Sequence, residues 1–100
     1  MPYNSLSGLQ PWLSPYAKWL LSLYPPAKVT STYRSYSDQL KLWLNRSSNP
    51  YPVAPPGRSY HELGRAFDVD APPEILEQLG AVWIRMGGTW HISDRIHFQA

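Results

Sequence analysis

Cysteine is absent from this chain of 100 residues, and histidine occurs only three times. Without cysteine the chain has no disulfides and no thiolate ligands, which leaves histidine and carboxylate side chains as its strong metal ligands. A long hydrophobic run is also lacking: the longest apolar cluster, WLLSLY at 19–24, is far too short to cross a bilayer. We therefore expect no membrane insertion.

An excess of charge of one sign is missing as well. Nine basic residues against seven acidic ones give a formal net charge of +2, and no two Lys or Arg residues are adjacent. Such a dispersed pattern does not predict nucleic-acid binding, so we expect no nucleic-acid partner. The N-terminal stretch MPYNSLSGLQ has neither the basic start nor the apolar run of a signal peptide, so no secretion signal is expected.

Apolar and aromatic residues, by contrast, are plentiful. Hydrophobic residues make up 43% of the chain and include 5 Trp and 7 Tyr, which is enough for a folded core despite 11 Pro. A chain of this length forms one domain at most, so we expect residues 1–100 to be a single domain. Any functional site must then be built from the same elements that form the core.

The first half of the chain predicts a helix, a strand and a second helix. Apolar residues recur at spacings of three and four over 9–23, as in an amphipathic helix, until Pro25 and the next proline end the pattern. β-Branched and aromatic residues over 27–34 favour a strand. Ser35, with Asp38 three residues later, resembles the capping box that begins a helix. The buried stripes expected of the two helices are Leu9, Trp12, Leu13, Tyr16, Leu20 and Leu23 in the first, and Leu40, Trp43 and Leu44 in the second.

The second half begins with a loop rich in proline, 47–57, and predicts most of the strands. Alternating side chains over 65–70 indicate a strand, and 74–80 a third helix whose last glycine is expected to be its C-cap. Two short strands are expected around 89–92 and 96–99. Interleaved helices and strands, with most strands late, predict an α+β fold in which a small antiparallel sheet packs with about three helices.

One stretch, SYHELGRAFDVD at 59–70, concentrates titratable groups. His61 precedes a turn at Gly64, and Asp68 lies on the strand after it, so the turn can bring the two side chains together. Catalytic zinc sites commonly use three protein ligands of the His and carboxylate type. His97 is the best candidate for the third ligand, because its two apolar neighbours would face the core while it points the other way.

None of these residues is decisive alone. A single histidine on such a strand is more often a structural residue than a ligand, and the polar residues of 59–70 could instead face water in a turn and a strand. His91 is more readily explained as a groove or surface residue than as a ligand. Trp90, beside it, is by default a core or groove aromatic.

Three blocks of the sequence match a family pattern. S-x-H-x-x-G-x-A-x-D is met at 59–68, acid-x-x-His at 94–97, and an Arg within S-x-x-R-S followed by a Gln at 31–39. Together they span nearly everything after the first helix. The combination resembles the LAS-type zinc peptidases of the D-Ala-D-Ala carboxypeptidase and VanY group, and most closely the L-alanyl-D-glutamate endopeptidases of phage endolysins. One departure is Arg95, where many relatives carry a short hydrophobic residue or Pro.

The resemblance implies a role for each matched residue. His61, Asp68 and His97 would hold Zn²⁺, and Asp94 would be the general base. For that role Asp94 must lie in the turn before the last strand, because strict alternation would place it on the face opposite His97. Arg34 would stabilise developing negative charge on the substrate. We also expect four residues to support the ligands or line the substrate groove: Ser59, which would fix the His61 loop by a hydrogen bond, Gln39, Trp90 and His91.

The resemblance also implies a fold and a substrate. The fold is expected to be hedgehog/D-Ala-D-Ala-peptidase-like, and the substrate a peptidoglycan stem peptide, cleaved most readily between L-Ala and D-Glu. That choice over D-Ala-D-Ala carboxypeptidase activity rests on Asp rather than Glu at position 94 and on the GGTW at 87–90. We expect a monomer that is made in the cytoplasm of a bacterial host and acts on the cell wall after release, or that is associated with a virion.

Other classes of function remain open. The same ligand set could serve a non-catalytic, metal-stabilised module that binds cell wall, or a structural piece of a virion. Because the positions expected to be catalytic are all filled, we favour the enzyme. A nucleic-acid-binding module is the third alternative, and only a DNA affinity that falls steeply with salt would support it.

Overall fold

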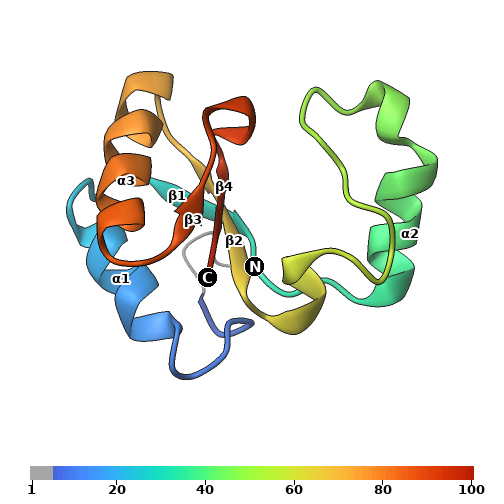
Figure 1. Ribbon diagram of the computed structural model, residues 1–100, viewed down its shortest axis with the longest axis horizontal. Helices are drawn as coiled ribbons and strands as arrows, with labels where there is room; N and C mark the ends of the chain where they lie inside the picture. The colour runs from blue at the N-terminus through green and yellow to red at the C-terminus, as the bar shows by residue number, and fades with distance from the viewer. Residues whose placement is uncertain (1–5) are drawn as a thin grey trace.

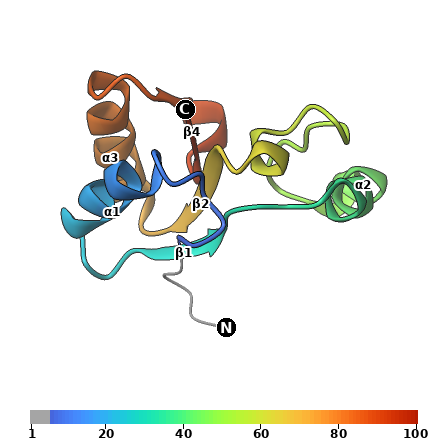
Figure 2. The ribbon, with the colours of Figure 1, turned by 90° about the horizontal axis from the view of Figure 1, so that it is seen from below.

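The computed structural model describes residues 6–100 and consists of a four-stranded sheet with helices on either side (Figure 1). The residues before Leu6, which hold half of the stretch inspected for a secretion signal, lie outside the described part. The helices α1 and α3 lie together on one side, and α2 stands apart on the other (Figure 2). The elements are α1 (Ser14–Ser22), β1 (Lys28–Ser31), α2 (Tyr36–Leu44), η1 (Arg46–Ser48), η2 (Tyr60–Leu63), β2 (Ala66–Asp70), α3 (Pro73–Arg85), β3 (Thr89–Trp90), η3 (Ile92–Asp94) and β4 (His97–Gln99).

The sheet is antiparallel throughout, with strand order β1-β2-β4-β3. This confirms the α+β prediction, with a small antiparallel sheet and three α-helices. In the two central strands Phe67 pairs with Phe98, and Asp68 pairs with His97. Because side chains alternate along a strand, this register sends the two phenylalanines to one face of the sheet and the polar pair to the other.

The core lies between the sheet and the pair α1 and α3. Phe67 and Phe98 stack with ring centroids 5.3 Å apart, and the edge of Trp83 from α3 meets Phe67 at the same centroid distance. All three side chains are buried. The opposite face of the central strands is therefore free to carry polar residues, held at fixed positions by this rigid core.

The first helix is shorter than predicted. It spans Ser14–Ser22, whereas the periodic pattern covers 9–23. Residues 11–13 form turns, and the helix begins only after them, with a proline in its first turn. The expected buried stripe is correct for Leu9, Leu13 and Leu20. It is wrong for three residues that face outward and are about half exposed: Trp12, Tyr16 and Leu23.

The second helix begins as predicted but does not join the core. Ser35 is its N-cap, and its side chain accepts a hydrogen bond from the Asp38 N–H. The expected apolar stripe is wrong for Leu40 and Leu44, which are exposed, whereas Trp43 is partly buried. Gln39 is the one buried residue of the helix. The periodicity predicted the helix, but the face that packs inward is polar because the helix covers the polar side of the sheet.

The third helix runs through the glycine that was expected to end it. α3 spans Pro73–Arg85, and Gly80 lies in its middle. A Cβ atom at Gly80 would collide with the ring of Trp90 on β3, so the glycine serves close packing and not chain reversal. The positive φ of 101° that follows the helix is at Gly87.

The strands end close to their predicted bounds, with one consequence for the site. β1 stops at Ser31, so Arg34 lies in the segment after the strand and not on it. η3 occupies the connection between β3 and β4 and places Asp94 before the last strand, where the sequence required it. Among the described residues no helix is long and apolar enough to span a membrane.

Candidate metal centre

His61 is held by a short, firmly closed turn. Ser59 is the N-cap of η2, and its side chain accepts a hydrogen bond of 3.2 Å from the His61 N–H. Gly64 ends the turn in the left-handed conformation, with φ of 67°, which glycine adopts at little cost. The turn leads the chain straight into β2, so His61 and Asp68 come from two adjacent elements and both are buried.

Glu62 closes the same turn from the other side. Its carboxylate accepts hydrogen bonds from the N–H groups of Gly57 and Ser59. Together with the Ser59 side chain this makes a complete capping box. The spacing S-x-x-E was a readable signal for this role, but sequence analysis did not assign one to Glu62.

Three potential ligand atoms converge on the polar face of the sheet. The Asp68 Oδ1 atom lies 3.1 Å from the His61 Nε2 atom and 3.3 Å from the His97 Nδ1 atom. One ligand atom from each of the three residues can be chosen so that all lie within 4.8 Å of one another. The two imidazole rings meet edge to face, with centroids 5.1 Å apart.

These separations suit a tetrahedral zinc site. With metal–ligand bonds of about 2.0–2.1 Å, two ligand atoms of a tetrahedron lie about 3.3 Å apart. The two separations to Asp68 Oδ1 agree with that edge length. Closing the site around one ion then requires the His61 and His97 ligand atoms, which lie within 4.8 Å of each other, to approach the same edge length.

The hydrogen bonding of His61 also fits a cation in this place. Its Nδ1 atom lies 2.5 Å from the Thr32 carbonyl oxygen, which can only accept, so Nδ1 carries the proton. In a neutral ring the Nε2 atom then presents a lone pair to the Asp68 carboxylate, which is itself an acceptor. Two acceptor atoms that face each other at 3.1 Å repel each other unless a positive charge lies between or beside them.

His97 has the same arrangement with its ring nitrogens exchanged. Its Nε2 atom lies 2.7 Å from the Gln99 Oε1 atom, so donation to Gln99 leaves the Nδ1 lone pair facing Asp68. Burial acts to lower the pKa of His97, but the hydrogen bonds that the protonated ring donates to Asp68 and Gln99 outweigh burial and raise it. Without a metal, a proton on His97 supplies the positive charge.

Arg34 supplies a permanent positive charge at the same carboxylate. Its Nη2 atom donates to the Asp68 Oδ2 atom at 2.8 Å. Gln39 holds the guanidinium from α2: its Oε1 atom accepts from Arg34 Nη1 at 3.2 Å, and its Nε2 donates to the Ala54 carbonyl at 2.9 Å. The one buried residue of α2 thus links that helix and the proline-rich loop to the site.

Asp94 faces the same pocket from the turn before β4. It is partly buried, and burial raises the pKa of its carboxyl group above the ordinary value, partly offset by the nearby His97. Within residues 6–100 its side chain forms no ion pair and no side-chain hydrogen bond. A carboxyl group that is free of structural bonds and has a raised pKa is suited to exchanging protons.

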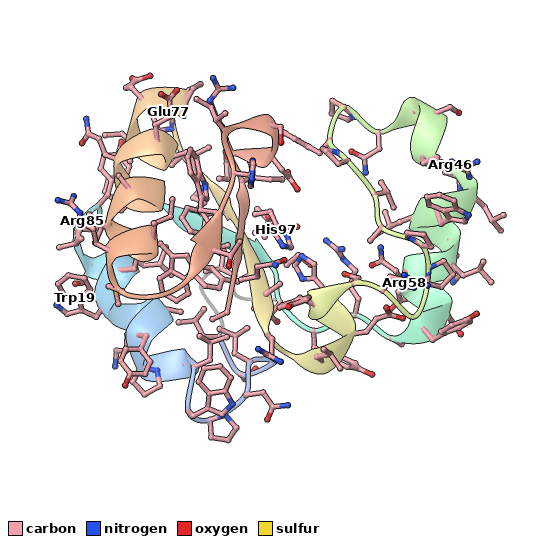
Figure 3. The ribbon with its side chains drawn as sticks, viewed as in Figure 1. Trp19, Arg46, Arg58, Glu77, Arg85 and His97 are labelled. Carbon is pink, nitrogen blue, oxygen red and sulfur yellow. The ribbon has the colours of Figure 1, made fainter. Side chains whose placement is uncertain are left out.

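The three convergent residues lie at the base of a pocket of about 460 Å³. Its walls come from the sheet on one side and from α2 and the proline-rich loop on the other. Figure 3 shows His97 on the sheet side of this opening and Arg58 on the α2 side. The pocket is also lined by Arg34, Gln39, Arg58, Ser59, Asp94 and Gln99.

The structure does not bring two of the expected groove residues to this pocket. The ring of Trp90 packs against Gly80 and Phe98, and its Nε1 atom donates to the Arg95 carbonyl at 2.8 Å. His91 is exposed at the start of η3. Neither residue lines the pocket that holds His61, Asp68 and His97.

Sequence analysis missed two residues that orient the histidines, Thr32 and Gln99. Thr32 acts through its backbone carbonyl, which no side-chain pattern can reveal. Gln99 lies two residues after His97 on the same strand and therefore on the same face, and that spacing was a usable signal.

A comparison with protein-family models gives one match at the level of sequence. The model for VanY, described as D-alanyl-D-alanine carboxypeptidase, matches residues 24–89. That range covers about two thirds of the chain and includes the segment with His61 and Asp68. No curated protein sequence matches significantly.

The solved structures that share the fold include two peptidases. One is a mutant of the vancomycin resistance D,D-pentapeptidase VanY from a VanB-type resistance cassette in complex with Zn(II), with a TM-score of 0.69 and 20% identity over 91% of this chain and 71% of that one. The other is the L-Ala D-Glu endopeptidase ChiX of Serratia marcescens, with a TM-score of 0.68 and 24% identity over 94% of this chain and 81% of that one. At these identities the likeness is one of fold.

Proposed function

The chain belongs to the VanY family of D-alanyl-D-alanine carboxypeptidases, and from that premise we propose that it is a zinc-dependent peptidase that cleaves peptidoglycan stem peptides. The observation that carries the proposal is the convergence of His61, Asp68 and His97 on one point at the base of a pocket. The family and the similarity of fold to two peptidases support the reaction class.

We propose that His61, Asp68 and His97 hold the zinc ion. The Zn(II) in the VanY structure of similar fold supports this choice of metal. When bound, zinc would lower the pKa of a coordinated water towards about 7 and polarise the scissile carbonyl. The protein orients its donors by hydrogen bonds to the far nitrogens of both imidazoles, from the Thr32 carbonyl and the Gln99 side chain.

Asp94 would act as general base and then as general acid. It would accept a proton from the attacking water and pass that proton to the leaving amine as the amide bond breaks. Its raised pKa brings its proton affinity closer to the working pH. Because its side chain forms no hydrogen bond with the described residues, the carboxylate is free to turn towards the substrate.

Arg34 would stabilise the negative charge that develops on the scissile carbonyl oxygen. In the metal-free protein it is paired with Asp68 and braced by Gln39. A guanidinium has five donors, so Arg34 can keep one bond to Asp68 and offer others to the substrate.

The bond we propose is the amide between L-Ala and D-Glu. Support comes from the family likeness of Asp94 and of the GGTW segment to the endolysin branch, and from the fold shared with an L-Ala D-Glu endopeptidase. The second candidate is the D-Ala-D-Ala bond, favoured by the description of the family model. Acting on either bond, the protein would work at the cell wall, and we propose that it does so as a monomer.

The variant Asp94→Ala distinguishes an enzyme from a module that binds the cell wall without cleaving it. Loss of a general base lowers kcat by about 100-fold or more, whereas zinc binding should be retained because Asp94 is outside the ligand set. Mass spectrometry of digested muropeptides identifies the bond, and metal analysis gives the zinc content. Cell-wall lysis that is undiminished in the zinc-loaded variant would contradict the proposed role. Release of D-Ala with an intact L-Ala to D-Glu bond would replace the endopeptidase by the carboxypeptidase.

A further inference from the structure

Arg58 is a second arginine in the pocket wall, besides Arg34. It lies in the turn just before Ser59, on the side of the pocket formed by α2 and the proline-rich loop, across from His97 (Figure 3). The side chain is exposed to solvent within the pocket. It therefore lines the pocket that a substrate at the candidate metal site would enter.

The guanidinium of Arg58 has no partner among residues 6–100, neither an ion pair nor a side-chain hydrogen bond. Most other arginines are engaged: Arg34 with Asp68, Arg95 with Glu77, and Arg65 with the Ala100 carbonyl. The acidic residue nearest in sequence is also committed elsewhere, because Glu62 accepts hydrogen bonds from backbone N–H groups. Within the described part of the chain, Arg58 thus remains an unneutralised cation in the pocket.

The backbone that carries Arg58 is fixed by three consecutive hydrogen bonds. The N–H groups of Gly57 and Ser59 both donate to Glu62, and the Arg58 N–H donates to the Pro55 carbonyl at 3.1 Å. Gly57 adopts a positive φ of 87° to make the turn. A side chain on so constrained a backbone loses less conformational freedom when it binds a ligand than one on a loose loop.

Both candidate substrates carry an anion at a comparable place. In a stem peptide D-Glu continues through its side-chain carboxyl, so its α-carboxylate is free and lies one carbon from the amine released by cleavage. In the D-Ala-D-Ala peptide the terminal α-carboxylate stands in the same relation to the leaving amine. An arginine recognises a carboxylate through paired, charge-assisted hydrogen bonds.

We propose that Arg58 forms a subsite for the free α-carboxylate of the residue whose amine is released. This inference rests on the proposed function and deepens it, because it names a group that selects the substrate. Arg34 pairs with Asp68 and serves the scissile carbonyl, whereas Arg58 is free for the carboxylate on the leaving side. The two arginines of the pocket thus have separate tasks.

The test uses pairs of short synthetic peptides, one pair for each candidate bond. Within a pair the peptides differ only in the leaving residue, whose α-carboxyl is a free acid or a carboxamide, so no other carboxylate of the cell wall contributes. Zinc-loaded wild type, Arg58→Ala, Arg58→Lys and Arg58→Glu are compared for kcat and KM. Their Kd values for the same peptides are measured by calorimetric titration. Arg85→Ala, an exposed arginine at the far end of α3, is the matched control (Figure 3).

We expect wild type to prefer the acid by about tenfold, mainly in KM, as for a partly exposed charge-assisted bond. Arg58→Ala should lose this preference, Arg58→Lys should keep part of it, and Arg58→Glu should reverse it, while Arg85→Ala behaves as wild type. The proposed subsite would be wrong if Arg58→Ala kept the preference for the acid over the carboxamide, or if wild type showed no such preference. If wild type cleaves neither pair but binds the acid in a manner that depends on Arg58, the proposed function fails and the subsite stands.

Discussion

Asp68 is the residue on which the charges of the pocket converge. Its Oδ1 atom faces both imidazoles, and its Oδ2 atom accepts a bond from Arg34. Burial acts to raise the pKa of Asp68, but the close contacts with His61 and His97 and the charge of Arg34 outweigh burial and hold it far below the ordinary value. The carboxylate is therefore ionised, and ready for a metal, at any physiological pH.

This balance predicts how Asp68→Asn affects the metal-free protein. Because the folded pKa is depressed, ionised Asp68 stabilises the fold above its unfolded pKa of about 4, and this contribution is lost as the pH falls towards the folded pKa. The variant should lower the free energy of unfolding by about 3 kcal/mol near pH 7, with a smaller loss below pH of about 4. Urea unfolding in a chelator over a pH series measures the difference, and a loss that is constant across the series would contradict the account.

At the residue scale, the sequence predicted side chains better than their backbone partners. His61, Asp68 and His97 share one chemistry and recognisable spacings, and the structure brings them together. The contact of the Thr32 carbonyl could not be foreseen, because a backbone group leaves no mark in the pattern of side chains. The roles of Asp94 and Arg34 remain predictions.

Among the elements, α2 differs most from its sequence-based description. The pattern of apolar residues predicted where it begins, but not what it packs against. It meets the rest of the molecule largely at the polar site, through Gln39, and leaves Leu44 about two-thirds exposed. Periodicity reports that a face is apolar, and it does not report whether another element covers that face.

The packing of α3 against β3 can be tested at Gly80. In an exposed helix Gly→Ala stabilises by about 1 kcal/mol, but here the added Cβ would meet the Trp90 ring. We therefore expect Gly80→Ala to destabilise by about 1–3 kcal/mol, as for other overpacked cores. Gln78→Ala on the exposed face of the same helix should change stability by no more than about 0.5 kcal/mol. Denaturant unfolding compares them, and a stabilised Gly80→Ala would show that Trp90 does not pack as described.

In the whole molecule, the sheet lies between the hydrophobic core that stabilises the fold and the candidate site. One face carries the aromatic core with α1 and α3, and the other carries the polar site beneath α2 (Figure 2). That residues 1–100 form a single domain was expected from length alone and stays a prediction. The layers themselves could be predicted from the interleaving of helices and strands, whereas the isolated position of α2 could not.

Because the site spans η2, β2 and β4, a bound metal should stabilise the fold as a whole. At a zinc concentration about 100 times the Kd, linkage adds about 2.7 kcal/mol to the free energy of unfolding. For a domain of this size that raises Tm by roughly 10 °C or more. His97→Ala should abolish the increase and His91→Ala should retain it, as followed by calorimetry with and without a chelator. An equal increase in both variants would place the metal elsewhere.

The most direct test of the central claim is an anomalous difference map, recorded at the zinc edge, from a crystal of the zinc-loaded protein. We expect one strong peak at the base of the pocket, about 2.0–2.2 Å from the His61 Nε2, His97 Nδ1 and Asp68 Oδ1 atoms. A map with no peak there, or with its main peak at His91, would contradict that claim.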